Sequence, residues 1–338
     1  MRTTQLLKTA YTAAGVSDTL QRYENRFDDG HARPEDRVGE AASLSSEYYG
    51  LATDFYLHGW GKLFHFGVRH QGESQQAALH KYETYLADKL QLQEEERCLD
   101  LGCGVGGPMI NIAQHSKVSI TGINKSLYQI EKGHEFVREA GMGSQCNFLS
   151  CDWMKIPLRD ETFDKAYGIE ATCHAAGRRT DLFREVNRLL KPGGLFATYE
   201  WVMTDKYDPA DLRHQQIKHQ IEIGNGLSDI TGAADVIDSL AAAGFEVLEC
   251  TDRASECDAD TPWYHPLRGE QFSFAHLRTS PAGRRIMHTA LAGLERLHVI
   301  PKGSTRVHEV LETAADGLVG GGELGIFTPM FFVLARKV

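Results

Sequence analysis

The amino-acid sequence predicts an α/β protein with a doubly wound, mostly parallel β-sheet. Three observations support this fold class. Between residues 97 and 202, apolar runs of strand length alternate with longer helical runs, which is typical of parallel strands joined by helical crossovers. A cluster of glycines directly follows the first strand-like run, where such sheets place a tight turn. With 338 residues, 42% of them hydrophobic, the chain can also bury a sizeable core.

The predicted elements begin with an amphipathic helix over 75–92, whose apolar residues recur at helical spacing. A polar turn separates it from a strand over 97–101. Further strands and helices follow, and the segment 191–194 (Lys-Pro-Gly-Gly) is expected to break the chain before a strand over 195–202. In chain order the intervening elements are a strand over 117–123, a helix over 127–140, strands over 146–151 and 163–169, and a helix over 181–190.

The alternation becomes irregular after Val202. A long mixed segment over 252–325 separates the last regular elements from a final strand over 328–335, so the sheet is completed only after an insertion. We expect the insertion to form a lid or substrate wall, with a structural scaffold as the alternative. Before it, the sequence predicts helices over 209–223 and 233–243 and a strand over 245–248. The expected divisions are an N-terminal segment over 1–74, a central domain over 75–250 and a C-terminal region over 251–338.

Composition excludes several classes of function. The formal net charge of −10 would repel a phosphate backbone, so no nucleic-acid partner is expected. The chain has neither the apolar core of a secretion signal nor a run long enough to span a bilayer, so a soluble, cytoplasmic protein is expected. The seven cysteines include no C-x-x-C pair and are expected to be reduced. No metal site is predicted, because neither H-E-x-x-H nor clustered Cys/His spacing occurs.

The glycine-rich turn is the first candidate binding site. Asp100 lies near the end of the strand over 97–101, and Gly102, Gly104 and Gly106 follow it where a helix begins. Glycines here permit a tight turn and a close approach of the backbone to a ligand at a helix N-terminus. Gly102, Gly104 and Gly107 also satisfy the dinucleotide fingerprint G-x-G-x-x-G. A nicotinamide-dependent oxidoreductase and a purely structural turn therefore remain alternatives.

Three features favour S-adenosylmethionine as the ligand of this turn. Asp100 places a carboxylate where it can meet an amino-acid ammonium, whereas it would face a pyrophosphate unfavourably. The next strand ends in Asn124 instead of the acid that dinucleotide enzymes offer to ribose, and Gln129 follows as a further candidate contact. Asp152 and Trp153 follow the third strand and suit an adenine amino group and ring. A helix N-cap is the alternative role of Asp152.

Several motifs carry a family resemblance. The run L-D-L-G-C-G-V-G-G, the Cys151-Asp152 step and L-L-K-P-G-G before a strand resemble the Rossmann-like methyltransferases. More specific segments resemble the sterol 24-C-methyltransferases, and this likeness extends from about Tyr48 to the C-terminus. These segments are F-Y-L-H-G-W-G and F-H-F (from Phe55 and Phe64), I-E-A-T-C-H-A (Ile169), Y-E-W-V-M-T-D-K-Y (Tyr199), P-W-Y (Pro262) and F-T-P-M-F-F-V-L-A-R-K (Phe327).

The resemblance implies a seven-stranded class I methyltransferase fold with S-adenosylmethionine as cofactor. It also implies transfer of the methyl group to C24 of a Δ24-sterol side chain through a carbocation, a hydride shift and loss of a proton. Such chemistry needs aromatic ring faces around the cation and one base near the new methyl group. The candidate substrate-binding rings are Tyr56, Trp60, Phe64, Phe66, Trp201, Trp263 and Tyr264.

The candidate catalytic groups are acids and one histidine near the predicted sheet edge. Glu170 ranks first, because it follows a strand at the carboxyl edge where open α/β sheets bind ligands, and it could also contact the cofactor. His65, Glu200, Tyr56 and Glu73 are the further candidates. Core packing is the alternative for Phe64 and Phe66. Trp60 is flanked by glycines, so we expect it in a flexible loop facing a ligand.

Other functions remain open at the level of sequence. The same cation chemistry could methylate another polyprenyl alkene such as squalene. A small-molecule N- or O-methyltransferase and a non-catalytic protein with a vestigial cofactor turn are further alternatives. A lipid substrate implies transient contact with a membrane surface, although no amphipathic segment can be assigned to it from the sequence. A homo-oligomer is also compatible with the sequence.

Overall fold

The computed structural model describes residues 13–27, 34–268 and 281–338, which cluster into two compact units. The sheet unit comprises Lys62–Thr204, Thr231–Trp263 and Thr328–Val338. The helical unit comprises the described residues up to Gly61, Asp205–Ile230 and the described residues of Tyr264–Phe327. Each unit is therefore assembled from three separate stretches of chain.

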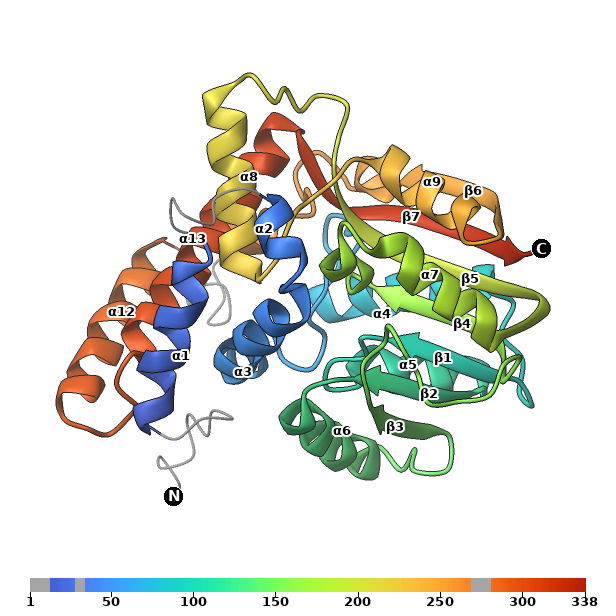
Figure 1. Ribbon diagram of the computed structural model, residues 1–338. Helices are drawn as coiled ribbons and strands as arrows, with labels where there is room; N and C mark the ends of the chain where they lie inside the picture. Colours follow the sequence, from blue (N-terminus) through green and yellow to red (C-terminus); the bar gives the residue numbers. More distant parts are fainter. Residues whose placement is uncertain (1–12, 28–33, 269–280) are drawn as a thin grey trace. The chain divides into compact units, whose positions relative to one another are not determined.

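The sheet unit is built on a seven-stranded sheet of order β3-β2-β1-β4-β5-β7-β6 (Figure 1). Strand β1 pairs in parallel with β2 and β4, β2 with β3, and β4 with β5, whereas β6 and β7 are antiparallel. The predicted doubly wound, mostly parallel sheet is confirmed. The strands are β1 (Arg97–Leu101), β2 (Ser119–Asn124), β3 (Cys146–Ser150), β4 (Phe163–Ile169), β5 (Leu190–Met203), β6 (Phe245–Asp252) and β7 (Phe327–Lys337).

The helices between these strands begin where the sequence offers caps. The Ser74 hydroxyl accepts a hydrogen bond from the Ala77 amide at the start of α4, and Ser126 accepts one from the Gln129 amide at the start of α6. Helix α5 instead begins at the glycine turn after β1. The helices are α4 (Gln75–Lys89), α5 (Gly107–Ser116), α6 (Leu127–Glu139), α7 (Arg179–Leu189) and α9 (Ala233–Ala242), with short 3-10 turns η2 (Thr172–Ala175) and η3 (Arg253–Glu256).

One predicted boundary is wrong. The Lys-Pro-Gly-Gly segment was expected to precede a strand, but β5 already begins at Leu190, on the other side of this segment. Leu190 pairs with Phe163 and Leu195 pairs with Lys165, so the residues between them form an irregular bulge. Gly193 has a φ of +74°, which an L side chain rarely adopts, and this explains why glycine is present in the bulge.

The core of the sheet unit explains the near-continuous apolar runs of the strands. Leu99 on β1 and Phe163 on β4 are fully buried in one cluster with side chains of α7 and α9. Within this cluster the rings of Phe183 and Phe196 lie 5.6 Å apart, and Phe196 lies 5.8 Å from Phe245. Parallel strands covered by helices lose the alternation of polar and apolar residues, as the sequence shows.

The helical unit contains the insertion and the N-terminal helices. Helix α13 packs along α8, and small residues permit the close approach: a Cβ added to Gly224 would lie 2.4 Å from the Cα of Ala314, and one on Gly317 would lie 2.9 Å from the Cβ of Gln220. The helices are α1 (Ala13–Asn25), α2 (Pro34–Val38), α3 (Ala41–Gly59), α8 (Leu212–Asn225), α10 (His265–Arg268), α12 (Pro281–Arg296) and α13 (Ser304–Leu324).

The segment around Trp60 differs from the prediction of a flexible loop. Tyr56 lies in the last turns of α3, and the Trp60 amide donates to the Tyr56 carbonyl oxygen at 2.7 Å, so Trp60 caps a helix. The helix forms because its inner face, including Leu44 and Leu51, is buried in a cluster with side chains of α1 and α13. None of the described helices has the length and apolar character needed to cross a bilayer.

Candidate active site

The glycine turn after β1 is held close to the neighbouring strands. The amides of Gly102 and Cys103 both donate to the Ile123 carbonyl oxygen, at 3.0 and 3.1 Å. A Cβ added to Gly102 would lie 2.6 Å from the Cβ of Ala171, so a larger residue cannot be accommodated there without a shift. A Cβ on Gly104 would meet no atom within 4 Å. The side of the Gly104 Cα where a side chain would stand therefore faces open space, as a ligand-binding turn requires.

The predicted cofactor contacts Asn124 and Gln129 lie at this turn. The Asn124 side-chain amide donates to the Gly104 carbonyl oxygen at 2.9 Å and to Gln129 Oε1 at 2.8 Å. The left-handed backbone of Gly106, with φ of +77°, leads from the turn into α5. Trp153 also lies against the turn, because its ring edge would be 3.5 Å from a Cβ on Gly102. Predicted residues from three separate segments, the glycine turn, 124–129 and Trp153, are thus brought together.

Asp152 is exposed beside this group. Its Oδ1 accepts a hydrogen bond from the Met154 amide at 2.9 Å, which stabilises a turn and no helix. Asp152 therefore does not cap a helix, which was the alternative role considered for it. No hydrogen bond to its Oδ2 is formed among the described residues, so that oxygen is available to a ligand.

Asp100 is a buried carboxylate at the end of β1. Its Oδ2 accepts a hydrogen bond from the Tyr167 hydroxyl on β4 at 2.9 Å. Burial raises the pKa of Asp100 to about 7, although the Tyr167 hydrogen bond acts in the opposite direction. No cationic side chain among the described residues contacts this carboxylate. A cationic ligand would supply the missing positive charge.

Glu170 follows β4 at the same edge of the sheet as the glycine turn, since its neighbour Ala171 touches Gly102. Its carboxylate is buried and accepts hydrogen bonds from the Phe66 amide at 2.7 Å and the Trp201 indole at 2.8 Å. Burial raises the pKa of Glu170 to about 7, while the charge of His65 and these hydrogen bonds oppose the rise. Its φ of +52° is a strained conformation for a glutamate, which is often retained at functional sites.

His65 is paired with a residue that the sequence prediction missed. Its Nε2 lies 2.8 Å from Glu83 Oε1 and its Nδ1 lies 2.7 Å from the Phe66 carbonyl oxygen. Both neighbouring atoms are oxygens, so the geometry suits an imidazolium that donates from both ring nitrogens. Burial lowers the pKa of His65, but the hydrogen bond and charge of Glu83 outweigh it and the pKa is raised. The raised pKa favours the protonated ring, which suits His65 to a positioning role better than to the role of a base.

Glu83 could have been detected in the sequence. The buried face of α4 consists of residues at helical spacing, and Glu83 stands on that face between Leu79 and Leu86. A carboxylate is rarely buried without a partner, so a glutamate on an apolar stripe predicts a buried cation nearby. The partner itself lies outside the helix, and no local pattern identifies it.

Two other acids predicted as catalytic groups have structural partners. Glu200 on β5 is fully buried, accepts a hydrogen bond from Thr172 and lies 3.7 Å from the Arg179 guanidinium. Glu73 forms an ion pair with Lys81 at 2.5 Å, and this hydrogen bond lowers its pKa, which makes it a weak base. Both acids thus have partners within the chain, whereas Glu200 Oε2 accepts no hydrogen bond from the described residues, and their predicted catalytic role stays a prediction.

The predicted aromatic residues fall into two groups. In the sheet unit, the Phe66 ring lies 6.2 Å from Trp201 and 5.0 Å, edge to face, from Trp263. Phe66 and Trp201 also supply the two hydrogen bonds to Glu170, whereas Phe64 is half-buried nearby in sequence. The helical unit holds the remaining rings: Tyr56, whose hydroxyl is hydrogen-bonded to Tyr48, Trp60, and Tyr264, whose ring lies 4.9 Å from the Arg268 guanidinium.

Two protein-family models match the chain. "Mycolic acid cyclopropane synthetase" matches residues 40–279, and "Sterol methyltransferase C-terminal" matches residues 274–337. The cycloartenol-C-24-methyltransferase of Arabidopsis thaliana is 44% identical over 322 residues, which are 95% of each chain. The sterol 24-C-methyltransferase of Kluyveromyces lactis is 40% identical over 337 residues, covering 98% of this chain and 90% of the relative.

Solved structures of similar fold include a cyclopropane synthase and a methyltransferase. The mycolic acid cyclopropane synthase CmaA1 from a complex with SAH and CTAB aligns with a TM-score of 0.68 at 18% identity, over 87% of this chain and 98% of that one. A geranyl diphosphate methyltransferase in complex with SAM aligns with a TM-score of 0.57 at 17% identity, over 81% of this chain and 98% of that one. At this level of identity the likeness concerns the fold.

Proposed function

This chain belongs to the sterol 24-C-methyltransferase family, and we propose that it transfers the methyl group of S-adenosylmethionine to C24 of a Δ24-sterol. The buried carboxylate of Glu170 is the observation that supports this reaction mechanism. It is held by Phe66 and Trp201 and shares one edge of the sheet with the glycine turn. An acid in apolar, aromatic surroundings is what a reaction through a carbocation requires.

The residues at the turn fit S-adenosylmethionine. Asp100 is a buried carboxylate without a contacting cation, which suits the ammonium of the amino-acid part. Asn124 and Gln129 present polar groups beside the open backbone of Gly104. Trp153 and the neighbouring Asp152 suit the adenine ring and its amino group. When bound, the cofactor supplies an electrophilic methyl group on a sulfonium, which leaves as a neutral thioether.

The aromatic side chains serve the sterol side chain. The C24 double bond is a weak nucleophile, and forming a bond from C24 to the methyl group leaves a cation on the neighbouring carbon. The negative faces of Phe66, Trp201 and Trp263 would stabilise this cation and exclude water that could trap it. Tyr56, Trp60, Phe64 and Tyr264 are further candidates for contact with the sterol.

Glu170 is the proposed base. After a hydride shift, the cation loses a proton near the new methyl group, and the electrons of that C–H bond form the product double bond. A carboxylate with a pKa of about 7 can accept this proton at neutral pH and release it afterwards. His65 would assist indirectly, because its positive charge lowers the pKa of Glu170 and its ring fixes the Phe66 backbone.

The test is mass spectrometry of products formed from S-adenosylmethionine and separate Δ24-sterols, 24-methylene sterols and squalene. A 24-methylated product from a Δ24-sterol is expected, and turnover of squalene alone would assign the chain to another polyprenyl alkene. Glu170→Gln is expected to bind the cofactor but form no product. Near-normal product formation by this variant would remove Glu170 from the mechanism. Because the substrate resides in bilayers, we also propose peripheral contact with a membrane surface.

A further inference from the structure

Helix α12 and the turn after it carry an unusual concentration of exposed apolar side chains. Among the described residues, eight large apolar side chains are exposed, and four of them lie between residues 286 and 299. The exposed fractions are 67% for Ile286, 37% for Leu294, 72% for Leu297 and 58% for Val299. Single exposed apolar residues are ordinary, but a contiguous group marks an interaction site.

These side chains form one stripe along the helix. At 3.6 residues per turn, Ile286, Ala290 and Leu294 recur on the same side of α12, where Ala290 and Gly293 are also exposed. Leu297 continues this spacing in the turn after the helix, where its amide donates to the Gly293 carbonyl oxygen. The helix therefore presents an apolar face to its surroundings, in addition to the buried Leu291.

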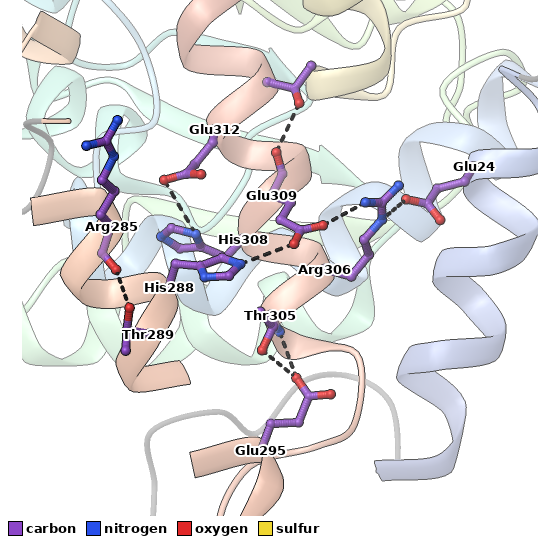
Figure 2. Close-up of polar contacts among 11 residues, drawn as sticks. Glu24, Arg285, His288, Thr289, Glu295, Thr305, Arg306, His308, Glu309 and Glu312 are labelled. Atoms are coloured by element: carbon purple, nitrogen blue, oxygen red, sulfur yellow. Dashed lines mark hydrogen bonds and ion pairs between the residues drawn. The ribbon is translucent and has the colours of Figure 1, made fainter. Parts of the chain in front are cut away.

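The polar face of α12 is directed toward α13, as Figure 2 shows. His288 Nε2 lies 3.1 Å from Glu309 Oε1, and the Glu295 carboxylate accepts hydrogen bonds from the amides of Gly303 and Thr305, each at 2.9 Å. These contacts cap the first turn of α13 and fix the rotation of α12 about its own axis. The outward orientation of the apolar stripe is thus set by specific hydrogen bonds.

The borders of the stripe are basic. Arg285 and Arg296 are exposed and stand eleven residues apart, which places both along the same side of the stripe. Exposed Lys302 follows in the turn to α13. Residues 281–303 contain four basic residues and one acidic residue, a net charge of +3 in a chain whose formal net charge is −10. The single acid, Glu295, is already used to cap α13.

We propose that this face, named here the α12 stripe (Ile286, Ala290, Gly293, Leu294, Leu297 and Val299, bordered by Arg285, Arg296 and Lys302), docks the protein onto a bilayer containing anionic lipids. A helix with an apolar face and flanking arginines lies in the interface, where the apolar side chains enter the acyl boundary and the guanidinium groups reach the phosphates. The positive border selects an anionic surface that the acidic remainder of the chain would repel. The choice of a bilayer as partner rests on the proposed lipid substrate.

The experiment is flotation of the full chain with vesicles of phosphatidylcholine, with and without phosphatidylserine. Wild-type protein is expected to float with the anionic vesicles. Leu297→Glu is expected to reduce the partition coefficient at least about tenfold, because a leucine no longer enters the apolar layer. Arg296→Glu should reduce it at least about fivefold on anionic vesicles and much less on neutral ones. The matched control is Leu212→Glu, since Leu212 is 78% exposed in the first turn of α8.

Several outcomes would overturn the assignment. Equal loss of flotation in Leu212→Glu and Leu297→Glu would mean that the α12 stripe has no special role. A concentration-dependent dimer that Leu297→Glu disrupts, without any flotation of wild type, would assign the face to a second copy of the chain. Turnover of detergent-dispersed sterol separates this inference from the proposed function: Leu297→Glu should retain it. A wild-type protein that floats but methylates no sterol would refute the function alone.

Discussion

Replacing Glu83 by glutamine would remove the countercharge of His65 while preserving the shape of the side chain. The His65 and Glu83 side chains are 2% and 0% exposed, so water cannot compensate for the lost charge. Removing one partner of a buried ion pair typically costs about 3–5 kcal/mol. His65 can avoid part of this cost by releasing its proton, because Glu83 is what raises its pKa. We therefore expect Glu83→Gln to lower the free energy of unfolding by about 2–3 kcal/mol at neutral pH.

The pH dependence of this loss follows from the direction of the pKa shift. The folded pKa of His65 is raised above 6.5, so its protonation stabilises the fold fully below that pH and the contribution is lost as pH rises through the folded pKa. In Glu83→Gln this contribution disappears. The difference in unfolding free energy between wild type and variant should therefore be larger at about pH 6 than at about pH 9.

Urea unfolding followed by circular dichroism measures both quantities. The matched control is Glu73→Gln, whose ion pair with Lys81 is at the surface because the Lys81 side chain is 72% exposed. This control should lose less than about 1 kcal/mol. A Glu83→Gln variant that behaves like Glu73→Gln at both pH values would refute the imidazolium assignment and, with it, the positioning role of His65.

Three further perturbations test the site. If Glu170 is the base, kcat should rise with pH through about 7 and then level, because the carboxylate must be deprotonated; a profile flat from about pH 5 to 8 would contradict this. Tyr82→Phe should leave stability unchanged or higher, because the buried Tyr82 hydroxyl has no hydrogen-bond partner among the described residues; a loss above about 1 kcal/mol in urea unfolding would disprove this. Gly107→Ala should cost at least about 2 kcal/mol, since its Cβ would lie 2.1 Å from the Lys62 carbonyl oxygen. The control Gly104→Ala should cost only the left-handed strain of about 1 kcal/mol, while weakening cofactor binding measured by calorimetry.

The sequence predicted the features that depend on local chain properties. Strand β4 was predicted with its observed boundaries, and the glycine turn was recognised because a tight turn needs glycines at fixed positions. Glu170 was found by a topological rule, since carboxyl ends of parallel strands meet at one edge of the sheet. Its contacts with Phe66 and Trp201 could not be predicted, because they join segments about 100 and 30 residues away along the chain.

The helical unit was predicted least well for the same physical reason. The Arg37 guanidinium donates to Glu222 at 2.7 Å and to the Ser228 carbonyl oxygen at 3.0 Å, across more than 180 residues of sequence. The sequence of the insertion showed no regular pattern, because α12 carries apolar residues on its exposed face as well as the buried Leu291, and α13 contains glycines that pack against α8. Both features contradict the usual amphipathic pattern of a helix on a core.

Each unit contains a buried acid whose negative charge is balanced by a neighbouring basic side chain. Glu83 contacts His65 directly, and Glu222 contacts Arg37 at 2.7 Å and Lys218 as well. Each of these carboxylates is therefore compensated within the folded chain. A buried acid without a basic partner destabilises the fold. Stability alone therefore does not explain why such an acid is present.

Asp100 and Glu170 differ, because neither carboxylate contacts a cationic side chain among the described residues, and only Glu170 has a nearby positive charge, that of His65. Both are buried, both are hydrogen-bonded only to neutral donors, and the pKa of each is raised to about 7. The proposed reaction brings two cations to this edge of the sheet: the S-adenosylmethionine donor, and the carbocation formed on the sterol side chain. Asp100 lies at the glycine turn where the first would bind, and Glu170 lies among the aromatic rings where the second would form. We therefore infer that the reactants supply the positive charges that these carboxylates lack. The electrostatic attraction would then stabilise the bound ligand and the transition state instead of the fold.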